Sequence, residues 1–261
     1  MATDWQTCWH ICGRMSTDSG ITSGPRPQLE RHDTSPPGGP PWNPGSKQRL
    51  TPYDCHKFDG DSVLDEVGRT VCEARCLPRK ELFESWEVAR RVLRKARGGP
   101  VLDVACGHGL VAWFVALIDR RTPFAVCVDP KFPANAERLA AVLSKRWPDI
   151  GARVRYDRVG VNEVEILESS RVVAVHACGD LTDQVLERSM AARARVAVLP
   201  CCHDHRELDD GGMSGWMPRA VAIDAVRAGR LRAVGYRVWT STIPVHLTPH
   251  NRLLVGVPPG A

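Results

Sequence analysis

A glycine turn between an apolar run and a helical pattern is the first feature of the sequence that could bind a ligand. Gly107 and Gly109 follow the run Val101-Leu-Asp-Val104 and precede an apolar segment that begins at Leu110. Because glycine has no Cβ, its backbone can turn tightly, and a ligand can approach the first amides of the following helix. This pattern is typical of nucleotide-cofactor sites.

Two carboxylates accompany the glycine turn. Asp129 ends a second apolar run, about twenty residues beyond Gly107, and this spacing suits an acid that accepts hydrogen bonds from a ribose. Asp103 lies inside the first apolar run, where burial is costly unless the carboxylate accepts from backbone amides or a ligand ammonium group. A cofactor with an amino-acid tail would account for Asp103.

Two further segments fall at the carboxyl ends of predicted strands, where open α/β sheets place their ligands. They are Val175-His-Ala-Cys-Gly-Asp-Leu-Thr-Asp183 and Leu199-Pro-Cys-Cys-His-Asp-His205. His176 or His203 can take a proton from an attacking hydroxyl or amine, because histidine titrates near neutral pH. Asp180 or Asp183 can orient that base, or can cap the next helix.

The same two segments allow a metal interpretation. Cys178, Cys201 and Cys202, with the neighbouring histidines, are ligand types that zinc accepts. Adjacent cysteines cannot easily both point at one ion, however, and cysteine is frequently a small buried apolar residue. We therefore predict no bound metal, and a thiolate nucleophile activated by a neighbouring histidine remains a further alternative.

Strand and helix patterns alternate around these motifs, which predicts an α/β fold with a mainly parallel doubly wound sheet. The predicted strands are one that begins at 101 and those over 124–129, 153–158, 172–177 and 195–200, and the predicted helices are 110–119, 133–147, 163–168, 182–193 and 218–233. The last two strands, 236–243 and 251–257, have no helix between them. We expect them to close the sheet as an antiparallel edge hairpin.

Three regions are predicted along the chain. Residues 1–48 carry a dense proline and glycine tract and read as a disordered tail, in which Cys8, His10 and Cys12 fall short of a full zinc pattern. Residues 49–97 form a helical extension of two helices that break near Pro78. Residues 98–261 form the Rossmann-like domain.

The net charge, the cysteine content and the length of the apolar runs limit the expected partners and cellular compartment. The 261 residues carry a net charge of +5 that is spread thinly, so no segment shows a nucleic-acid footprint. The 10 cysteines lie in apolar strands and beside histidines, and no signal peptide precedes them, which favours a reduced, cytoplasmic protein. No apolar run approaches the roughly twenty residues that span a bilayer, and no obligate protein partner is indicated.

The motifs carry a family resemblance. The segment Asp103-Val-Ala-Cys-Gly-His-Gly109, Asp129 and the terminal hairpin resemble the Rossmann-like (class I) S-adenosylmethionine-dependent methyltransferases, over roughly residues 98–257. The resemblance implies that Gly107 and Gly109 lie against the methionine and ribose of S-adenosylmethionine, while Asp129 takes the ribose hydroxyls. We assign Asp103 and Cys178 to the cofactor as well.

A narrower resemblance concerns the histidine and cysteine motifs. They are similar to a methyltransferase group with His-x-Cys-Gly after the fourth strand and Cys-Cys-His after the fifth, which includes transfer-RNA 2′-O-methyltransferases acting in the acceptor stem. The matching residues are His176, Cys178, Gly179, Asp183, Cys201, Cys202 and His203. The sequence departs from that group because no Cys/His zinc-finger modules precede the domain, so the acceptor remains open.

The sequence therefore predicts a methyltransferase that uses S-adenosylmethionine and acts on an oxygen or nitrogen of an acceptor, either RNA or a small molecule. His176 and His203 are the predicted bases, with Asp180 in support. Gly107-His-Gly109-Leu-Val-Ala112 also fits a dinucleotide fingerprint, so an NAD-type oxidoreductase is an alternative. A third hypothesis is a non-catalytic RNA-binding module with a cofactor fold.

Overall fold

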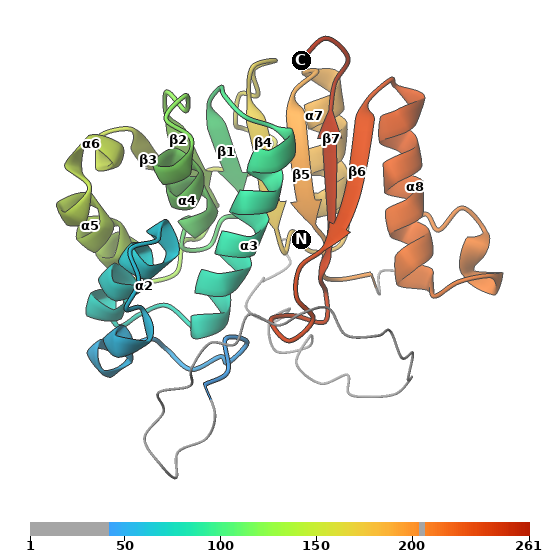
Figure 1. Ribbon diagram of the computed structural model, residues 1–261. Coiled ribbons are helices and arrows are strands. Elements are labelled where there is room, and N and C mark those ends of the chain that lie inside the picture. The colour runs from blue at the N-terminus through green and yellow to red at the C-terminus, as the bar shows by residue number, and fades with distance from the viewer. Residues whose placement is uncertain (1–41, 204–206) are drawn as a thin grey trace. The chain divides into compact units, whose positions relative to one another are not determined.

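The computed structural model describes residues 42–203 and 207–261, and residues 44–261 form one compact unit (Figure 1). The predicted tail therefore lies almost wholly outside the described residues, as do Cys8, His10 and Cys12. Asp204 and His205 also lie outside them.

The unit holds helices and strands in the alternating order that the sequence predicts. In chain order they are η1 (Pro52–Lys57), α2 (Val63–Ala74), α3 (Arg79–Lys95), β1 (Val101–Val104), α4 (Leu110–Ile118), β2 (Ala125–Val128), α5 (Ala136–Arg146), α6 (Pro148–Gly151), β3 (Val154–Asp157), β4 (Arg171–Val175), α7 (Leu181–Ala191), β5 (Arg195–Leu199), η2 (Met213–Gly215), α8 (Arg219–Ala233), β6 (Arg237–Thr242) and β7 (Arg252–Val257).

The strands form one seven-stranded sheet in the order β3-β2-β1-β4-β5-β7-β6. The strands from β1 to β5 pair in parallel, whereas β7 runs antiparallel to both β5 and β6. The predicted mainly parallel sheet and its antiparallel edge hairpin are both confirmed. The chain order reverses between β1 and β4, and open α/β sheets bind their ligands at such a switch point, beyond the carboxyl ends of the strands.

Helices cover both faces of the sheet. On one face, Leu102 of β1 belongs to a buried apolar cluster with Val185 of α7 and Leu231 of α8. Successive strand residues point to opposite faces, and Asp103 accordingly accepts a hydrogen bond from Ala112 of α4 on the other face. The sheet is therefore doubly wound, as predicted.

Two α-helices precede the first strand, with the predicted break at Pro78. Helix α2 starts at an N-cap whose side chain, that of Ser62, accepts from the Asp65 amide, and Pro78 stands at the start of α3. Helix α3 packs against α4, and α2 packs against α5. The boundary between residues 97 and 98 stays a prediction.

The helix predicted over 163–168 is wrong, because these residues form turns and irregular backbone. Val161 and Val164 are both buried, and their spacing of three residues imitates a helical face. The Glu163 carboxylate accepts a hydrogen bond from the Gly160 amide at 2.8 Å, which closes a tight turn. The two valines reach the core from this turn.

Across the residues that the structure describes, every helix is too short or too polar to cross a bilayer.

Candidate active site

In the loop after β1, the backbone at residue 109 accommodates only glycine. Gly109 has a φ of +75°, and a Cβ there would lie 2.5 Å from the Cys127 sulfur and 3.0 Å from the Tyr156 hydroxyl. Gly107 also has a positive φ, of +54°, but a Cβ there would meet nothing within 4 Å. Gly109 thus packs the loop onto the sheet, while Gly107 faces open space that a ligand can enter.

Two predicted cofactor residues from neighbouring strands meet at this loop. The Gly107 amide donates to Asp129 Oδ2 at 3.1 Å, and the Lys131 amide donates to Oδ1 at 2.9 Å. Asp129 is buried at the end of β2, and this burial raises the pKa of its carboxyl. The carboxylate and the glycine loop therefore form one local structure.

Asp103 is buried inside β1, where its Oδ2 accepts from the Ala112 amide at 3.1 Å. Burial raises the pKa of Asp103 to about 8, and the charge of Asp129 adds to the rise, whereas the Ala112 hydrogen bond opposes it. Of the two roles predicted for this carboxylate, the structure shows the contact with a backbone amide. The contact ties β1 to the first turn of α4.

His176 lies directly after β4 with a φ of +61°, and its Nε2 is 3.1 Å from Glu84 Oε1 of α3. Lys80 Nζ lies 3.1 Å from the same oxygen. Burial by itself would raise the pKa of Glu84, but His176 and Lys80 outweigh that effect and lower the pKa below its usual value. Glu84 is therefore ionised at neutral pH and orients the His176 ring.

His203 follows β5 and is also paired with a carboxylate, which is half-buried. Its Nε2 lies 2.8 Å from Asp224 Oδ1 of α8. Arg252 Nε donates to Asp224 Oδ2 at 2.7 Å, and Arg227 Nη1 donates to Oδ1 at 3.3 Å. Burial favours a higher pKa for Asp224, but its contacts with His203 and Arg252 outweigh burial and lower the pKa. The result is an ionised aspartate held against the imidazole.

A third histidine lies near the first two. His250 belongs to the segment that joins β6 to β7, and burial lowers its pKa, with further lowering from the nearby His176 and His203. His250 is therefore uncharged at neutral pH. The sequence analysis assigned no role to His250.

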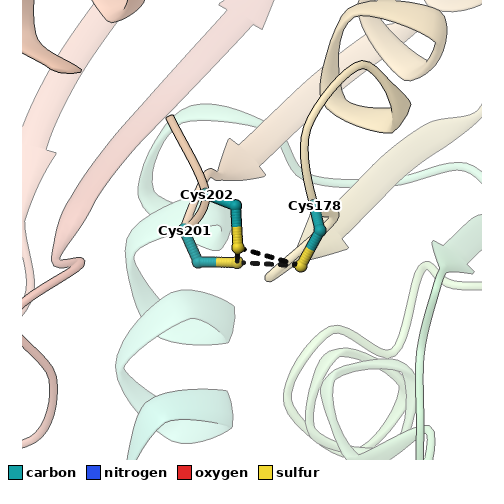
Figure 2. Close-up of side chains that lie close together, drawn as sticks. All are labelled: Cys178, Cys201 and Cys202. Atoms are coloured by element: carbon teal, nitrogen blue, oxygen red, sulfur yellow. Dashed lines mark hydrogen bonds between the residues drawn. The ribbon is translucent and has the colours of Figure 1, made fainter. Parts of the chain in front are cut away.

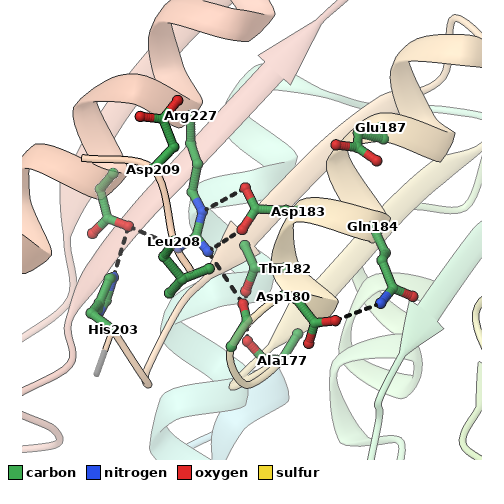
Figure 3. Close-up of polar contacts among 12 residues, drawn as sticks. Ala177, Asp180, Thr182, Asp183, Gln184, Glu187, His203, Leu208, Asp209 and Arg227 are labelled. Carbon is green, nitrogen blue, oxygen red and sulfur yellow. Dashed lines mark hydrogen bonds and ion pairs between the residues drawn. The ribbon is translucent and has the colours of Figure 1, made fainter. Parts of the chain in front are cut away.

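Asp180 was predicted to support a catalytic histidine. It is exposed at the start of α7 and accepts a hydrogen bond from Gln184 Nε2 at 3.0 Å (Figure 3). Asp183, one turn further, binds Arg227 Nη2 at 2.6 Å in the same view. Because α7 begins at Leu181 and turns Asp180 toward solvent, the carboxylates that support the histidines come from other helices.

Cys178, predicted to contact the cofactor, lies in a cluster with Cys201 and Cys202 (Figure 2). The sulfurs of the adjacent Cys201 and Cys202 are 3.4 Å apart and both face Cys178, contrary to the expectation that neighbouring cysteines diverge. Cys202 is disulfide-bonded, so the expectation of a fully reduced chain does not hold for it.

Helix α3 supplies two acids that the sequence reasoning missed. Glu81 Oε2 lies 2.8 Å from His108 Nδ1 in the loop after β1, and Glu84 reaches His176 after β4. The two acids are three residues apart, so they share one face of the helix. The sequence signal for these acids was their spacing of three residues on a predicted helix, in a chain whose histidine motifs follow predicted strands.

Solved structures with a similar arrangement include several methyltransferases. The mitomycin 7-O-methyltransferase MmcR has a TM-score of 0.45 and 15% identity, over 80% of this chain and 63% of that one. A putative O-methyltransferase from Nostoc punctiforme has a TM-score of 0.43 and 15% identity, over 69% of this chain and 60% of that one. A Pyrococcus abyssi tRNA (uracil-54, C5)-methyltransferase in complex with S-adenosyl-L-homocysteine has a TM-score of 0.42 and 15% identity, over 67% of this chain and 38% of that one. The chain thus spans less than two thirds of the length of these proteins.

The sequence itself matches a known family model. Residues 83–208 match the model described as a methyltransferase domain, which is just under half of the chain. A search of curated proteins finds no match. The matched segment runs from α3 through β5 and includes the glycine loop and both histidine–cysteine motifs. Residues 83–208 thus match a methyltransferase domain, and the sheet that contains them has a Rossmann-like strand order.

Proposed function

We propose that the protein transfers a methyl group from S-adenosylmethionine to an oxygen or nitrogen of its acceptor, with His203 as the general base. The observation that carries the proposal is the 2.8 Å contact between His203 and the ionised Asp224, at the carboxyl edge that also bears the glycine loop. When bound, S-adenosylmethionine supplies a methyl group that its positively charged sulfur makes electrophilic.

The loop after β1 fits this cofactor. Gly107 faces open space, so a ligand can approach the backbone there. Asp129 accepts two backbone amides, and because a carboxylate has about four acceptor positions, it retains capacity for the ribose hydroxyls. The N-terminus of α4, which begins at Leu110, lies beside the loop, and a helix N-terminus favours polar ligand groups. Asp103 would stand behind this loop as a support.

His203 is placed to accept a proton. When its Nε2–H donates to Asp224, the lone pair resides on Nδ1, which is the tautomer that a base requires. The negative charge of Asp224 then stabilises the imidazolium that forms. Proton removal by a positioned base contributes roughly 10²- to 10⁴-fold to a rate.

His176 is the second candidate base, and Glu84 orients it in the same manner. The two histidines follow adjacent strands, β4 and β5, so both stand on one side of the switch point. Gly107 and Asp129 stand on the other side, after β1 and β2. An acceptor between the two groups would have cofactor on one side and a base on the other, which is the alignment that methyl transfer needs.

RNA is the acceptor class that we propose first, with a small molecule as the alternative. The support is the resemblance of the His-x-Cys-Gly and Cys-Cys-His motifs to the transfer-RNA group, together with their placement on adjacent strands. Methyl transfer itself is independent of this choice.

The test incubates the protein with S-adenosylmethionine labelled on the methyl group and with cellular RNA, protein and small molecules as separate fractions. We expect label in the RNA fraction, released by nuclease digestion as a methylated nucleoside. Label in the small-molecule fraction would replace RNA as the acceptor while keeping methyl transfer. Absence of label from every fraction, together with no binding of S-adenosylmethionine, would contradict the function itself.

A further inference from the structure

Three cysteine sulfurs converge between the ends of β4 and β5. Cys178 Sγ lies 3.2 Å from Cys201 Sγ and 3.4 Å from Cys202 Sγ, and the remaining pair is 3.4 Å apart. Cys201 and Cys202 are buried, and Cys178 is half-buried. All three side chains point to a common centre (Figure 2). The histidine–carboxylate pairs described above do not use these sulfurs.

The spacing is close to that of a thiolate metal site. Zinc binds cysteine sulfur at roughly 2.3 Å in tetrahedral geometry, which places bound sulfurs about 3.8 Å apart. The three separations fall short of this value by about half an ångström, a shift within reach of side-chain rotation. Three thiolates so close together, two of them buried, would repel one another strongly unless a cation joined them.

We propose that Cys178, Cys201 and Cys202, once all three are reduced, bind a single zinc ion as thiolates. Soft sulfur ligands select zinc over magnesium or calcium. Three sulfurs leave one tetrahedral position for water or a further ligand, which is the coordination pattern of catalytic rather than closed structural zinc sites.

Binding requires a change at all three sulfurs. Cys202 is disulfide-bonded, so a reductant must first supply two electrons. A phosphine does so by cleaving the disulfide with one water molecule, which yields two thiols and the phosphine oxide. Cys178 Sγ donates to the His176 carbonyl oxygen at 3.3 Å, and this proton leaves when the thiolate binds the ion. Zinc binding therefore releases up to three protons, one for each thiol.

The decisive experiment uses the full chain reduced with a phosphine and titrated with Co²⁺, a spectroscopic substitute for zinc. We expect one equivalent of Co²⁺ to bind, with sulfur-to-cobalt charge-transfer absorption and the visible bands of tetrahedral cobalt. Zinc should displace it and abolish both signals. The oxidised protein should bind at least tenfold more weakly, because it lacks the Cys202 thiolate.

Cys178→Ser tests the ligand set, and Cys55→Ser is its matched control. Cys55 lies on η1, and its Sγ contacts the Arg69 carbonyl oxygen at 3.9 Å, in a different part of the unit. We expect Cys178→Ser to weaken Co²⁺ binding more than tenfold and Cys55→Ser to leave it unchanged. Equal binding by the two variants would overturn the site.

A second measurement needs no variant. In the reduced wild-type protein, zinc should protect Cys178, Cys201 and Cys202 from iodoacetamide, as read by peptide mass spectrometry, while Cys55 is modified at the same rate with and without zinc. Unchanged labelling of the three cysteines, or no metal bound to reduced protein, would refute the proposal. Both readouts are independent of methyl transfer.

Discussion

The backbone amide of Gly107 donates a hydrogen bond to the Asp129 carboxylate across 3.1 Å, and this contact joins two residues 22 positions apart. It holds the loop after β1 against the end of β2 before any ligand arrives. A site held in its binding conformation loses less entropy on binding, so the contact favours cofactor affinity. The glycine supplies the open space and the aspartate supplies the acceptor oxygens.

Gly109→Ala should destabilise the fold by more than about 1 kcal/mol, because its Cβ would lie 2.5 Å from the Cys127 sulfur in a left-handed backbone conformation. Gly229→Ala is the matched control, since a Cβ there meets nothing within 4 Å inside α8. The control should stabilise by about 0.5–1 kcal/mol, as alanine does in a helix. Urea unfolding measures both, and similar changes in the two variants would contradict the packing of the loop.

Asp224→Asn should reduce the rate of label transfer by about 10²- to 10⁴-fold, because an amide neither stabilises the His203 imidazolium nor enforces the tautomer that accepts a proton. The affinity for S-adenosylmethionine should stay unchanged. Glu187→Gln, a carboxylate-to-amide change at a side chain 65% exposed on α7, is the control and should retain the wild-type rate. Equal rates for the two variants would remove Asp224 from the mechanism.

Asp103→Asn should flatten the dependence of stability on pH. The pKa of Asp103 is about 8 in the folded protein, above its ordinary value of 3.8, so the folded state keeps a proton that the unfolded state releases. Stability from this group therefore falls as the pH rises from about 4 to about 8, by up to about 1.4 kcal/mol per pH unit. Asparagine keeps an acceptor for the Ala112 amide but cannot ionise. Its unfolding free energy relative to wild type should rise between pH 5 and 8, and a constant difference would contradict the assignment.

Asp119→Ala should destabilise the protein by about 3–5 kcal/mol, because it leaves the Arg171 guanidinium buried without its carboxylate. Arg171 Nη1 lies 2.9 Å from Asp119 Oδ2, with the two side chains 1% and 4% exposed. Glu168→Ala breaks an exposed pair with Arg193 and should cost less than about 1 kcal/mol. Denaturant unfolding distinguishes them, and comparable losses would show that burial does not govern the Arg171 pair.

Local patterns predicted most of the fold. Glycine positions, apolar runs and the absence of a helix between the last strands gave the doubly wound sheet and its hairpin. The helix over 163–168 failed because Val161 and Val164 are buried at helical spacing without a helical backbone. The spacing of apolar residues indicates which side chains are buried, but side chains can be buried without a helical backbone.

The site was harder to predict because its pairs join distant segments. His176 meets Glu84 across 92 positions, and His203 meets Asp224 across 21 positions, on a helix whose sequence shows no motif. The sequence placed the histidines at the sheet edge but assigned the support to Asp180, which is the acid nearest to His176 in the chain. Proximity along the chain was a poor guide, since helices α3 and α8 bring their acids to the edge through tertiary packing.

Calorimetric titration of S-adenosylmethionine into the wild-type protein and into Asp129→Ala tests the central claim most directly. The account predicts one binding site in the wild type and at least a tenfold loss of affinity in the variant, because Asp129 accepts the ribose hydroxyls and also holds the Gly107 loop. Equal affinity in the two proteins, or binding of NAD with no heat from S-adenosylmethionine, would contradict it.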